Sequence, residues 1–387
     1  MLARLAGART IFPGLVTVAA CAVYGILFLH AESQIELFVL IALGLAGAWL
    51  AARQHWGERA RASFSAHPRT LQASVVVAVV IALAIFRGEH FPLLMLATVL
   101  LYFTACLGLT VQFGYAGVVN FAGAAFFGIG AYTAAVLVGH TNIPHALVMA
   151  LGGLVAALIG SLLILPVLRT RGHYAALVTI AFGILFRQFI EVNDALGGPQ
   201  GLQVKGMNLF GWELNTPLGI GDEEFSFYAS YVLLGLLLAA AAYVFVRRLE
   251  RSWAGLNLDA VRLDETVCAV FGIRVERWKI VAFTFGNLLA GIAGAAYAQM
   301  VGFVAPTSFT FGDSLIMVSI IILGGLGNPW GVALAAAIVV VLPEKLQVLQ
   351  EYRLLLYAVL VIAVLLFRPD GLLPRRTREY APGWRLQ

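Results

Sequence analysis

A small set of polar side chains interrupts the apolar segments of this 387-residue chain. They are Tyr115, Asn120, Tyr132, Asn287 and Gln299. Their hydroxyl and amide groups can donate and accept hydrogen bonds, so they are candidates for lining a path for a small polar molecule. Each could instead bridge two helices, because a hydrogen bond inside a membrane stabilises a helix pair by about 0.6 kcal/mol on average.

No motif for catalysis accompanies these residues in the sequence. There is no GxxxxGK[ST] loop and no lysine follows a glycine, so the chain has no P-loop with which to bind ATP. HExxH and GxSxG patterns are also missing, the histidines are dispersed, and the cysteines show no CxxC spacing. We therefore expect a protein that is not an enzyme and that has neither a metal site nor a cofactor.

The elements that must position the polar residues are predicted to be membrane-spanning helices. Hydrophobic residues make up 61% of the chain, charged residues 12%, and the mean hydropathy is +0.91. About 20 helical residues cross the roughly 30 Å hydrocarbon core of a bilayer. The apolar runs are continuous and do not alternate with period two, which favours helices over a closed barrel. The predicted fold class is therefore an all-α, polytopic transmembrane bundle.

The apolar runs define the predicted spans. The long ones cover 11–29, 35–52, 71–86, 91–110, 116–138, 146–168, 173–190, 227–246 and 279–300, and shorter ones cover 313–326, 331–343 and 352–367. We expect about ten crossings if 313–343 is a hairpin that only partly enters the bilayer, and about twelve if every short piece crosses. The predicted organisation is an N-terminal helix pair with a basic loop (1–70), a core (71–375) and a tail (376–387).

The distribution of charge predicts the orientation of the chain. Arginine and lysine collect in 53–69, 169–171, 247–279 and the C-terminal tail, whereas the loop 191–226 is acidic. Positive charge is retained on the cytoplasmic side of a membrane, so both termini are predicted to be cytoplasmic and 191–226 extracytoplasmic. This bias accounts for the net charge of +5 without a nucleic-acid partner.

The loop 247–278 contains a predicted two-faced helix over 254–272. Apolar residues such as Leu258, Val267 and Phe271 recur near helical spacing, Asp264 and Glu265 lie on the more polar face, and Gly272 is placed to end the helix. Such a helix could lie on membrane lipid at the headgroup level, or it could dock a cytoplasmic partner.

Glycines mark two further features. In GGLGNPW, residues Gly324, Gly325, Gly327, Asn328 and Pro329 predict a hairpin tip, because glycine permits positive φ and proline stops a helix. Gly327 and Gly331 are expected to let the two flanking segments pack face to face. We place this tip near the 254–272 helix, either as a plain turn or as a second contact to a partner. The segment 112–137 is also rich in glycine, which predicts a broken helix that lines a cavity.

Three stretches together resemble one family. They are FGYAGVVNFAGAAFFGIGAYTAAVL, AGLNLDAVRLDETVCAVFGIRVERWKIVAFTFGNLLAGIAGAAYA and ILGGLGNPWGVALAAAIVVVLPE, within about 91–373. The combination is similar to the LivM-type permeases, the membrane subunits of ABC importers for branched-chain amino acids. The family usually has Arg where this chain has Leu256 and Asp259.

The resemblance implies a set of partners and a location. A LivM-type permease would pair with a second, LivH-like permease, two ATP-binding subunits and an extracytoplasmic solute-binding protein, in the bacterial cytoplasmic (inner) membrane. The 254–272 helix would be the element that couples to the ATP-binding subunits. Its candidate coupling residues are Leu258, Arg262, Asp264, Glu265, Val267, Phe271 and Gly272.

Two other functions remain open at this point. Permeases for urea and short amides share the three signatures, so the substrate could be an amide. A secondary transporter without ATP-binding partners would place ionisable residues inside its spans. Arg187 and Glu191 are the main candidates of that kind in this chain.

Overall fold

The computed structural model describes most of the chain. The described residues are 2–54, 56–169, 173–209, 211–220, 223–346 and 370–375, together with 352, 355, 358–359, 362 and 366. Most of the predicted 352–367 segment, the tail 376–387 and part of the basic turn at 169–171 lie outside them.

The described chain is predominantly helical, as the sequence predicts. The α-helices are α1 (Leu2–His30), α2 (Gln34–Arg53), α3 (Trp56–Ala66), α4 (Pro68–Ile85), α5 (His90–Thr110), α6 (Gly123–His140), α7 (His145–Arg169), α8 (His173–Val192), α9 (Tyr228–Arg251), α10 (Trp253–Leu263), α11 (Glu265–Val270), α12 (Val275–Val301), α13 (Phe311–Gly324) and α14 (Pro329–Lys345). Among the described residues, 10 helical segments are long and apolar enough to cross a membrane. This confirms the polytopic helical fold class.

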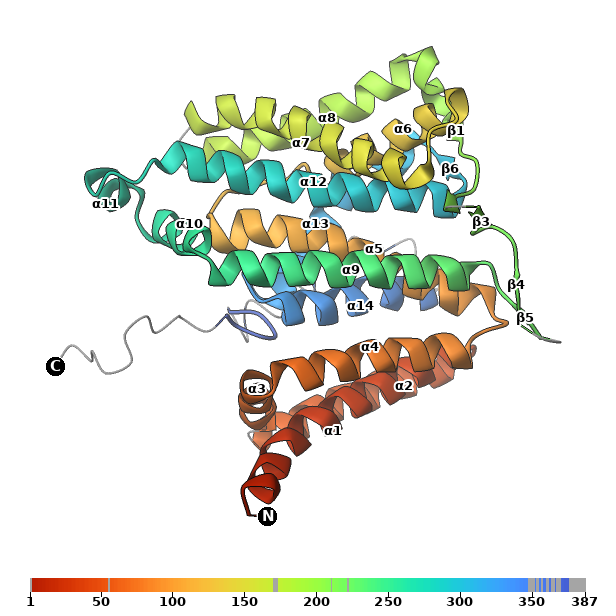
Figure 1. Cartoon of the computed structure of the whole chain (residues 1–387), viewed down its shortest axis with the longest axis vertical. Helices are drawn as coiled ribbons and strands as arrows, with labels where there is room; N and C mark the ends of the chain where they lie inside the picture. Colours follow the sequence, from red (N-terminus) through yellow and green to blue (C-terminus); the bar gives the residue numbers. More distant parts are fainter. Residues whose placement is uncertain are drawn as a thin grey trace.

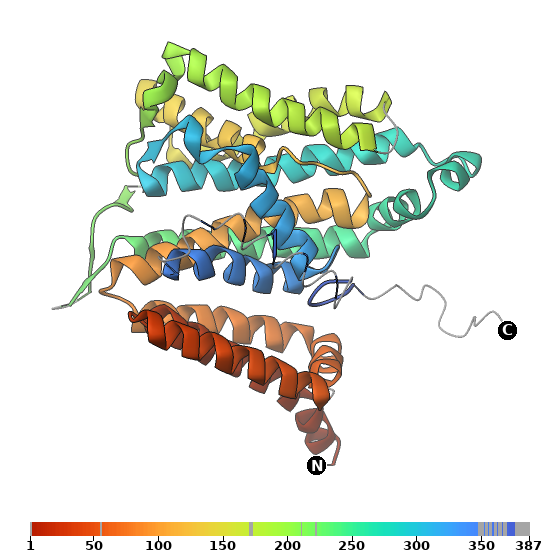
Figure 2. The same cartoon turned by 180° about the vertical axis from the view of Figure 1, so that it is seen from behind.

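The helices form two groups that lie side by side (Figures 1 and 2). Helices α1 to α4 make one group, in which the backbone N–H of Gly14 donates to the Ser63 hydroxyl at 3.2 Å. Helix α4 packs against both α1 and α3, so the group continues to Ile85. It meets the other helices through a few contacts, including the hydrogen bond from Gln72 to Tyr243 at 3.2 Å and the Phe64–Trp330 ring pair at 5.3 Å.

Helix α12 lies at the centre of the larger group and packs against α5, α6 and α7. Small residues make this packing possible. A Cβ atom added at Gly130 of α6 would collide with the carbonyl oxygen of Gly291 on α12, so the two backbones touch directly. Close approach of this kind drives helix association where lipid removes the hydrophobic driving force. Gly286 and Gly294 of α12 are equally close to the backbones of α5 and α6, so this side of α12 is a packing surface.

The bundle has two distinct ends (Figure 1). Helices α3, α10 and α11 gather at one, which we call the α10 end, and the short strands lie at the other, the strand end. The strands pair antiparallel: β1 (Leu202–Gln203) with β6 (Phe303–Val304), β2 (Asn208–Leu209) with β3 (Trp212–Glu213), and β4 (Leu218–Ile220) with β5 (Glu223–Phe225). Three 3₁₀ turns, η2 (Asp194–Leu196), η3 (Gly198–Gln200) and η4 (Pro306–Ser308), lie beside them in the chain. Neither α3 nor these strands were predicted from the sequence.

The predicted span 116–138 begins too early. Helix α5 continues as a π-helix, η1 (Val111–Tyr115), and the chain is then irregular until α6 starts at Gly123. Gly117 has φ +67°, a conformation that glycine adopts readily. The backbone N–H of Val118 turns back to donate to the Gln112 carbonyl at 2.9 Å. The glycine-rich segment is thus broken, as predicted, and the break lies before α6.

Candidate functional site at the α10 end

The predicted 254–272 helix is two helices, α10 and α11, with a break at Asp264. Asp264 has φ −157° and ψ 111°, and its carboxylate accepts hydrogen bonds from the backbone N–H groups of Thr266 and Val267, at 2.8 and 3.0 Å. The residue therefore ends α10 and caps α11 at once, which is the reason a single helix cannot continue through it. Gly272, at φ +79°, follows α11 and ends it as predicted.

Helix α10 turns its apolar face inward. Leu258 and Val261 are fully buried. Arg262 also reaches into the bundle, where its Nη1 donates to the carbonyl oxygen of Gly114 in η1 at 2.6 Å. Two of the predicted coupling residues, Leu258 and Arg262, therefore also hold α10 to the rest of the chain, Leu258 by burial and Arg262 by a hydrogen bond from a side chain that remains exposed.

Helix α11 and its flanks are exposed instead. The exposed fraction is 82% for Val270 and 79% for Phe271, Val267 is 49% exposed, and Leu263, the last residue of α10, is 85% exposed. Glu265 pairs with Lys279 of α12 at 2.6 Å, which ties the start of α11 to the bundle. The α10 end thus presents large apolar side chains to its surroundings on a short helix that projects beyond the other elements (Figure 1).

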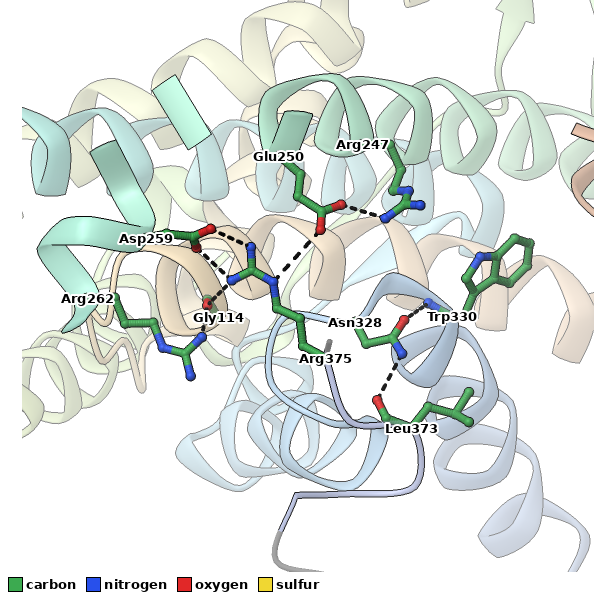
Figure 3. A network of polar contacts seen from close by, with 9 residues as sticks. All are labelled: Gly114, Arg247, Glu250, Asp259, Arg262, Asn328, Trp330, Leu373 and Arg375. Atoms are coloured by element: carbon green, nitrogen blue, oxygen red, sulfur yellow. Dashed lines mark hydrogen bonds and ion pairs between the residues drawn. The ribbon is translucent and has the colours of Figure 1, made fainter. Parts of the chain in front are cut away.

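A network of charged residues lies beneath α10 (Figure 3). Its centre is Arg375, on a segment 370–375 that we call the C-terminal strap. The guanidinium makes two hydrogen bonds to the Asp259 carboxylate, at 2.7 and 2.9 Å, and one to the Gly114 carbonyl, at 3.3 Å. It also lies 4.3 Å from the centroid of the Tyr115 ring and 3.9 Å from a carboxylate oxygen of Glu250.

The α13–α14 hairpin meets this network. Its turn has Gly325 at φ +105° and Gly327 at φ +86°, as glycine permits. The Asn328 side chain accepts from the Trp330 backbone N–H at 3.1 Å and donates to the Leu373 carbonyl of the strap at 2.9 Å (Figure 3). The hairpin tip therefore lies close to α10, as the sequence predicts.

Two details of the hairpin differ from the prediction. Pro329 is the first residue of α14 and does not end α13, because its missing N–H is tolerated in a first turn. Gly324 ends α13, and a Cβ added to it would lie 2.6 Å from the carbonyl carbon of Gly331. The close contact between the two helices is thus Gly324 with Gly331, where the sequence suggested Gly327 with Gly331.

Asn120 and Asn287 come together in the structure. Both are fully buried, and Asn120 donates to Asn287 at 3.1 Å. Gln112 of η1 completes the group: it accepts from Asn120 at 2.8 Å and donates to Asn287 at 3.0 Å. We call these three residues the amide cluster. The Nδ2 atom of Asn287 has no hydrogen-bond partner among the described residues.

The other candidate path residues make their contacts elsewhere. Tyr132 is buried beside Phe309, with ring centroids 5.9 Å apart. The side-chain oxygen of Gln299 forms a hydrogen bond with the His145 ring at 2.6 Å. The backbone carbonyl of Gln299 accepts a hydrogen bond from the Tyr231 hydroxyl at 2.9 Å. Tyr115 lies under Arg375 at the α10 end. The residues that sequence reasoning missed are Gln112, Glu250, Asp259 and Arg375.

Comparisons with known proteins give a consistent result. Residues 91–365 match the sequence profile of the family described as branched-chain amino acid transport system / permease component. The chain is 36% identical over 319 residues to the high-affinity branched-chain amino acid transport system permease protein LivM of Salmonella typhimurium, which covers 79% of this chain and 74% of that protein. For LivM of Escherichia coli the identity is 37% over 289 residues, covering 71% and 68%.

A second type of permease is also similar. The permease protein LivH of Salmonella typhimurium is 22% identical over 290 residues, which is 71% of this chain and 91% of that protein. No solved structure matches the chain.

Proposed function

Since this chain belongs to the branched-chain amino acid transport permease family, we propose that it is one of two permease subunits in an ABC importer. It forms half of the translocation path for branched-chain or related amino acids. The second half comes from a LivH-like permease, the energy from two separate ATP-binding subunits, and the substrate from an extracytoplasmic binding protein. The LivM and LivH relatives described above are named as permeases of branched-chain amino acid transport systems. Their names favour this substrate class over urea and short amides.

The observation that carries this proposal is the contrast in exposure at the α10 end. Val270 and Phe271 are large apolar side chains with most of their surface exposed, on an element that projects from the bundle (Figure 1). Exposed apolar patches of this kind mark interaction surfaces. Helix α10 holds α11 in place through Leu258 and Arg262, which are buried in or bonded to the bundle. This arrangement favours a rigid attachment point for a partner protein over a helix that lies on membrane lipid at the headgroup level.

The proposed partner is tested directly with Phe271. Replacing Phe271 by Glu adds a charge to the exposed apolar surface, so we expect co-purification of the ATP-binding subunits to fall at least tenfold while the amount of inserted chain stays unchanged. Phe271→Leu keeps the surface apolar and serves as the control. Undiminished co-purification of the Phe271→Glu chain would argue that α11 lies on lipid.

Transport is tested in vesicles that hold the two permeases with or without their ATP-binding subunits. Amino-acid uptake should require both the subunits and ATP, because the sequence of this chain has no P-loop. Uptake at full rate without any ATP-binding subunit would contradict the importer proposal and would favour a secondary transporter.

The proposed orientation places the α10 end in the cytoplasm and the strand end outside. Arg59 of α3 and Asn208 of β2 are both exposed at these opposite ends. Single cysteines at the two positions should react with an impermeant reagent from opposite sides of the membrane. Ser63 is less suitable as a probe, since only 2% of it is exposed. Labelling of both positions from one side would contradict the orientation.

A further inference from the structure

The C-terminal strap is fixed to the hairpin by its backbone. The backbone N–H groups of Leu372 and Leu373 donate to the carbonyls of Leu323 and Gly324, at 2.8 and 3.1 Å. These carbonyls belong to the last turn of α13, where a helix leaves its C=O groups without intrahelical partners. A Cβ added at Gly371 would lie 2.5 Å from the Cα of Gly325, so strap and turn are in backbone contact. The strap therefore carries Arg375 to a defined position.

Arg375 joins three elements, η1, α9 and α10, each of which lies far from it in the sequence. Its side chain is 14% exposed and that of Asp259 is 17% exposed, so the pair is largely shielded from solvent. The two parallel hydrogen bonds from guanidinium to carboxylate fix the orientation of both groups as well as their distance. The same guanidinium also contacts Gly114 of η1 and Glu250 of α9 (Figure 3). Helix α10 is thereby connected through one side chain to η1 and to α9.

The Gly114 carbonyl oxygen accepts hydrogen bonds from two arginine side chains. Arg262 of α10 donates to it at 2.6 Å and Arg375 of the strap at 3.3 Å. The helix ends directly after Gly114, at Tyr115, so its carbonyl has no continuing helical turn from which to accept a hydrogen bond. Short π-helical segments of this kind are frequent at functional sites. A displacement of α10 or of the strap therefore acts on this carbonyl.

The same five-residue π-helix holds the amide cluster. Gln112 donates from one nitrogen to the Asn287 side chain and to the Phe283 carbonyl of α12, both at 3.0 Å. It also accepts from Asn120, in the irregular segment that leads into α6. Gln112 and Gly114 are two residues apart in η1. A displacement of the Gly114 backbone is therefore expected to displace Gln112 as well.

We propose that Arg375 is a positioning residue for transport, which holds α10 against η1 through Asp259 so that movement of α10 reaches the buried amide cluster. This inference rests on the proposed function, in which the α10 end receives the ATP-driven movement. It assigns a role to a residue of the C-terminal strap that touches neither a substrate nor the exposed surface of α11.

The test compares uptake with ATP hydrolysis in the assembled complex. Asp259→Asn and Arg375→Gln each remove one charge of the pair, and we expect the number of amino acids imported per ATP hydrolysed to fall about tenfold, within the usual range of coupling effects. The double variant should be no worse than either single one, because the two groups act as one unit. Arg248→Gln, which removes an exposed charge from the neighbouring turn of α9, is the matched control and should keep the wild-type ratio.

The outcomes are distinguishable. A wild-type ratio in both single variants would overturn the inference, and so would effects that simply add in the double variant. If Arg375→Gln fails to assemble, Arg375→Lys decides, because lysine keeps the charge and loses the two-pronged geometry. A reduced ratio in Arg375→Lys supports the inference and an unchanged one overturns it. Failure of the wild-type complex to show ATP-dependent uptake would instead contradict the proposed function.

Discussion

Helices α10 and α11 follow each other with Asp264 alone between them, yet the middle of α10 is buried and the end of α11 is exposed. Helix α10 buries Leu258 and Val261, whereas α11 and its end expose Val270 and Phe271. Both helices carry apolar residues at similar spacing, so periodicity does not distinguish them. The difference comes from distant partners: the side chains of Asp259 and Arg262 meet Arg375 and Gly114, which lie elsewhere in the sequence. A short amphipathic helix is thus oriented by the charges it can pair.

The largest difference in the free energy of unfolding is expected between a substitution on the buried side of α10 and one on the exposed side of α11. Leu258→Ala leaves a cavity in a fully buried site and should lower the free energy of unfolding by about 2–5 kcal/mol. Val270→Ala removes an exposed side chain and should change it by less than about 0.5 kcal/mol. Thermal unfolding of the purified chains in detergent measures both. Equal effects would mean that α10 is no better anchored than α11.

Two glycines give the next comparison. A Cβ at Gly255 in α10 would collide with the carbonyl oxygens of Leu249 and Glu250, so Gly255→Ala should destabilise by about 3 kcal/mol. At Gly272 nothing lies within 4 Å, and only the positive φ opposes a side chain, so Gly272→Ala should cost about 1 kcal/mol. The same unfolding measurement applies. A larger loss at Gly272 than at Gly255 would contradict the close packing of α10 on α9.

The Asp264 cap should matter to α11 alone. Asp264→Ala leaves the N–H groups of Thr266 and Val267 without their acceptor and should destabilise α11 by about 1 kcal/mol. Hydrogen exchange should become faster at these two amides and stay unchanged in α10. Asp264→Asn keeps an acceptor oxygen and is the control. Faster exchange throughout α10 would show that the two helices unfold as one unit.

The smallest effect concerns a thiol on the inner side of α11. Burial, and then the charges of Asp264 and Glu265, raise the pKa of Cys268 above its ordinary value of 9.0. The thiolate is the reactive form, so alkylation of Cys268 should be slow at neutral pH and should rise as the pH passes above that value. The measurement uses a chain with Cys21 and Cys106 replaced. A cysteine placed at exposed Val270 should react faster at every pH, and equal rates would contradict the inward face of α11.

The main spans could be predicted because each is a continuous apolar run of membrane length. The hairpin at Gly325 was also predictable, since glycine at positive φ and a following proline have few other uses. The broken segment before α6 was recognised from its glycines, but the π-helix was not. The π-helix is defined by backbone hydrogen bonds five residues apart, such as that from the Ala116 N–H to the Val111 carbonyl at 3.1 Å, and the residue types give no sign of that spacing.

The centre of the candidate site could not be predicted. Arg375 belongs to a basic run with Arg376 and Arg378 whose charges all satisfy the same orientation rule, so nothing in the sequence separates it from its neighbours. Asp259 reads as a solvent-exposed charge on a short helix, because its partner lies 116 residues away. Asp264 was assigned to a polar helix face, although aspartate suits a helix cap equally well. In each case the residue type allowed two positions. A long-range contact decided between them for Arg375 and Asp259, and a local helix cap decided for Asp264.

The strap also sets an order of events during synthesis. Arg375 lies 116 residues after Asp259, so α10 leaves the ribosome well before Arg375 exists to pair with it. Contacts between residues so far apart form late in folding. A nascent chain therefore displays α11 on an incompletely held α10 until residue 375 has been added. We expect the proposed ATP-binding subunits to meet a finished attachment point only on chains translated through the strap, so that synthesis of the strap acts as a checkpoint for assembly of the importer.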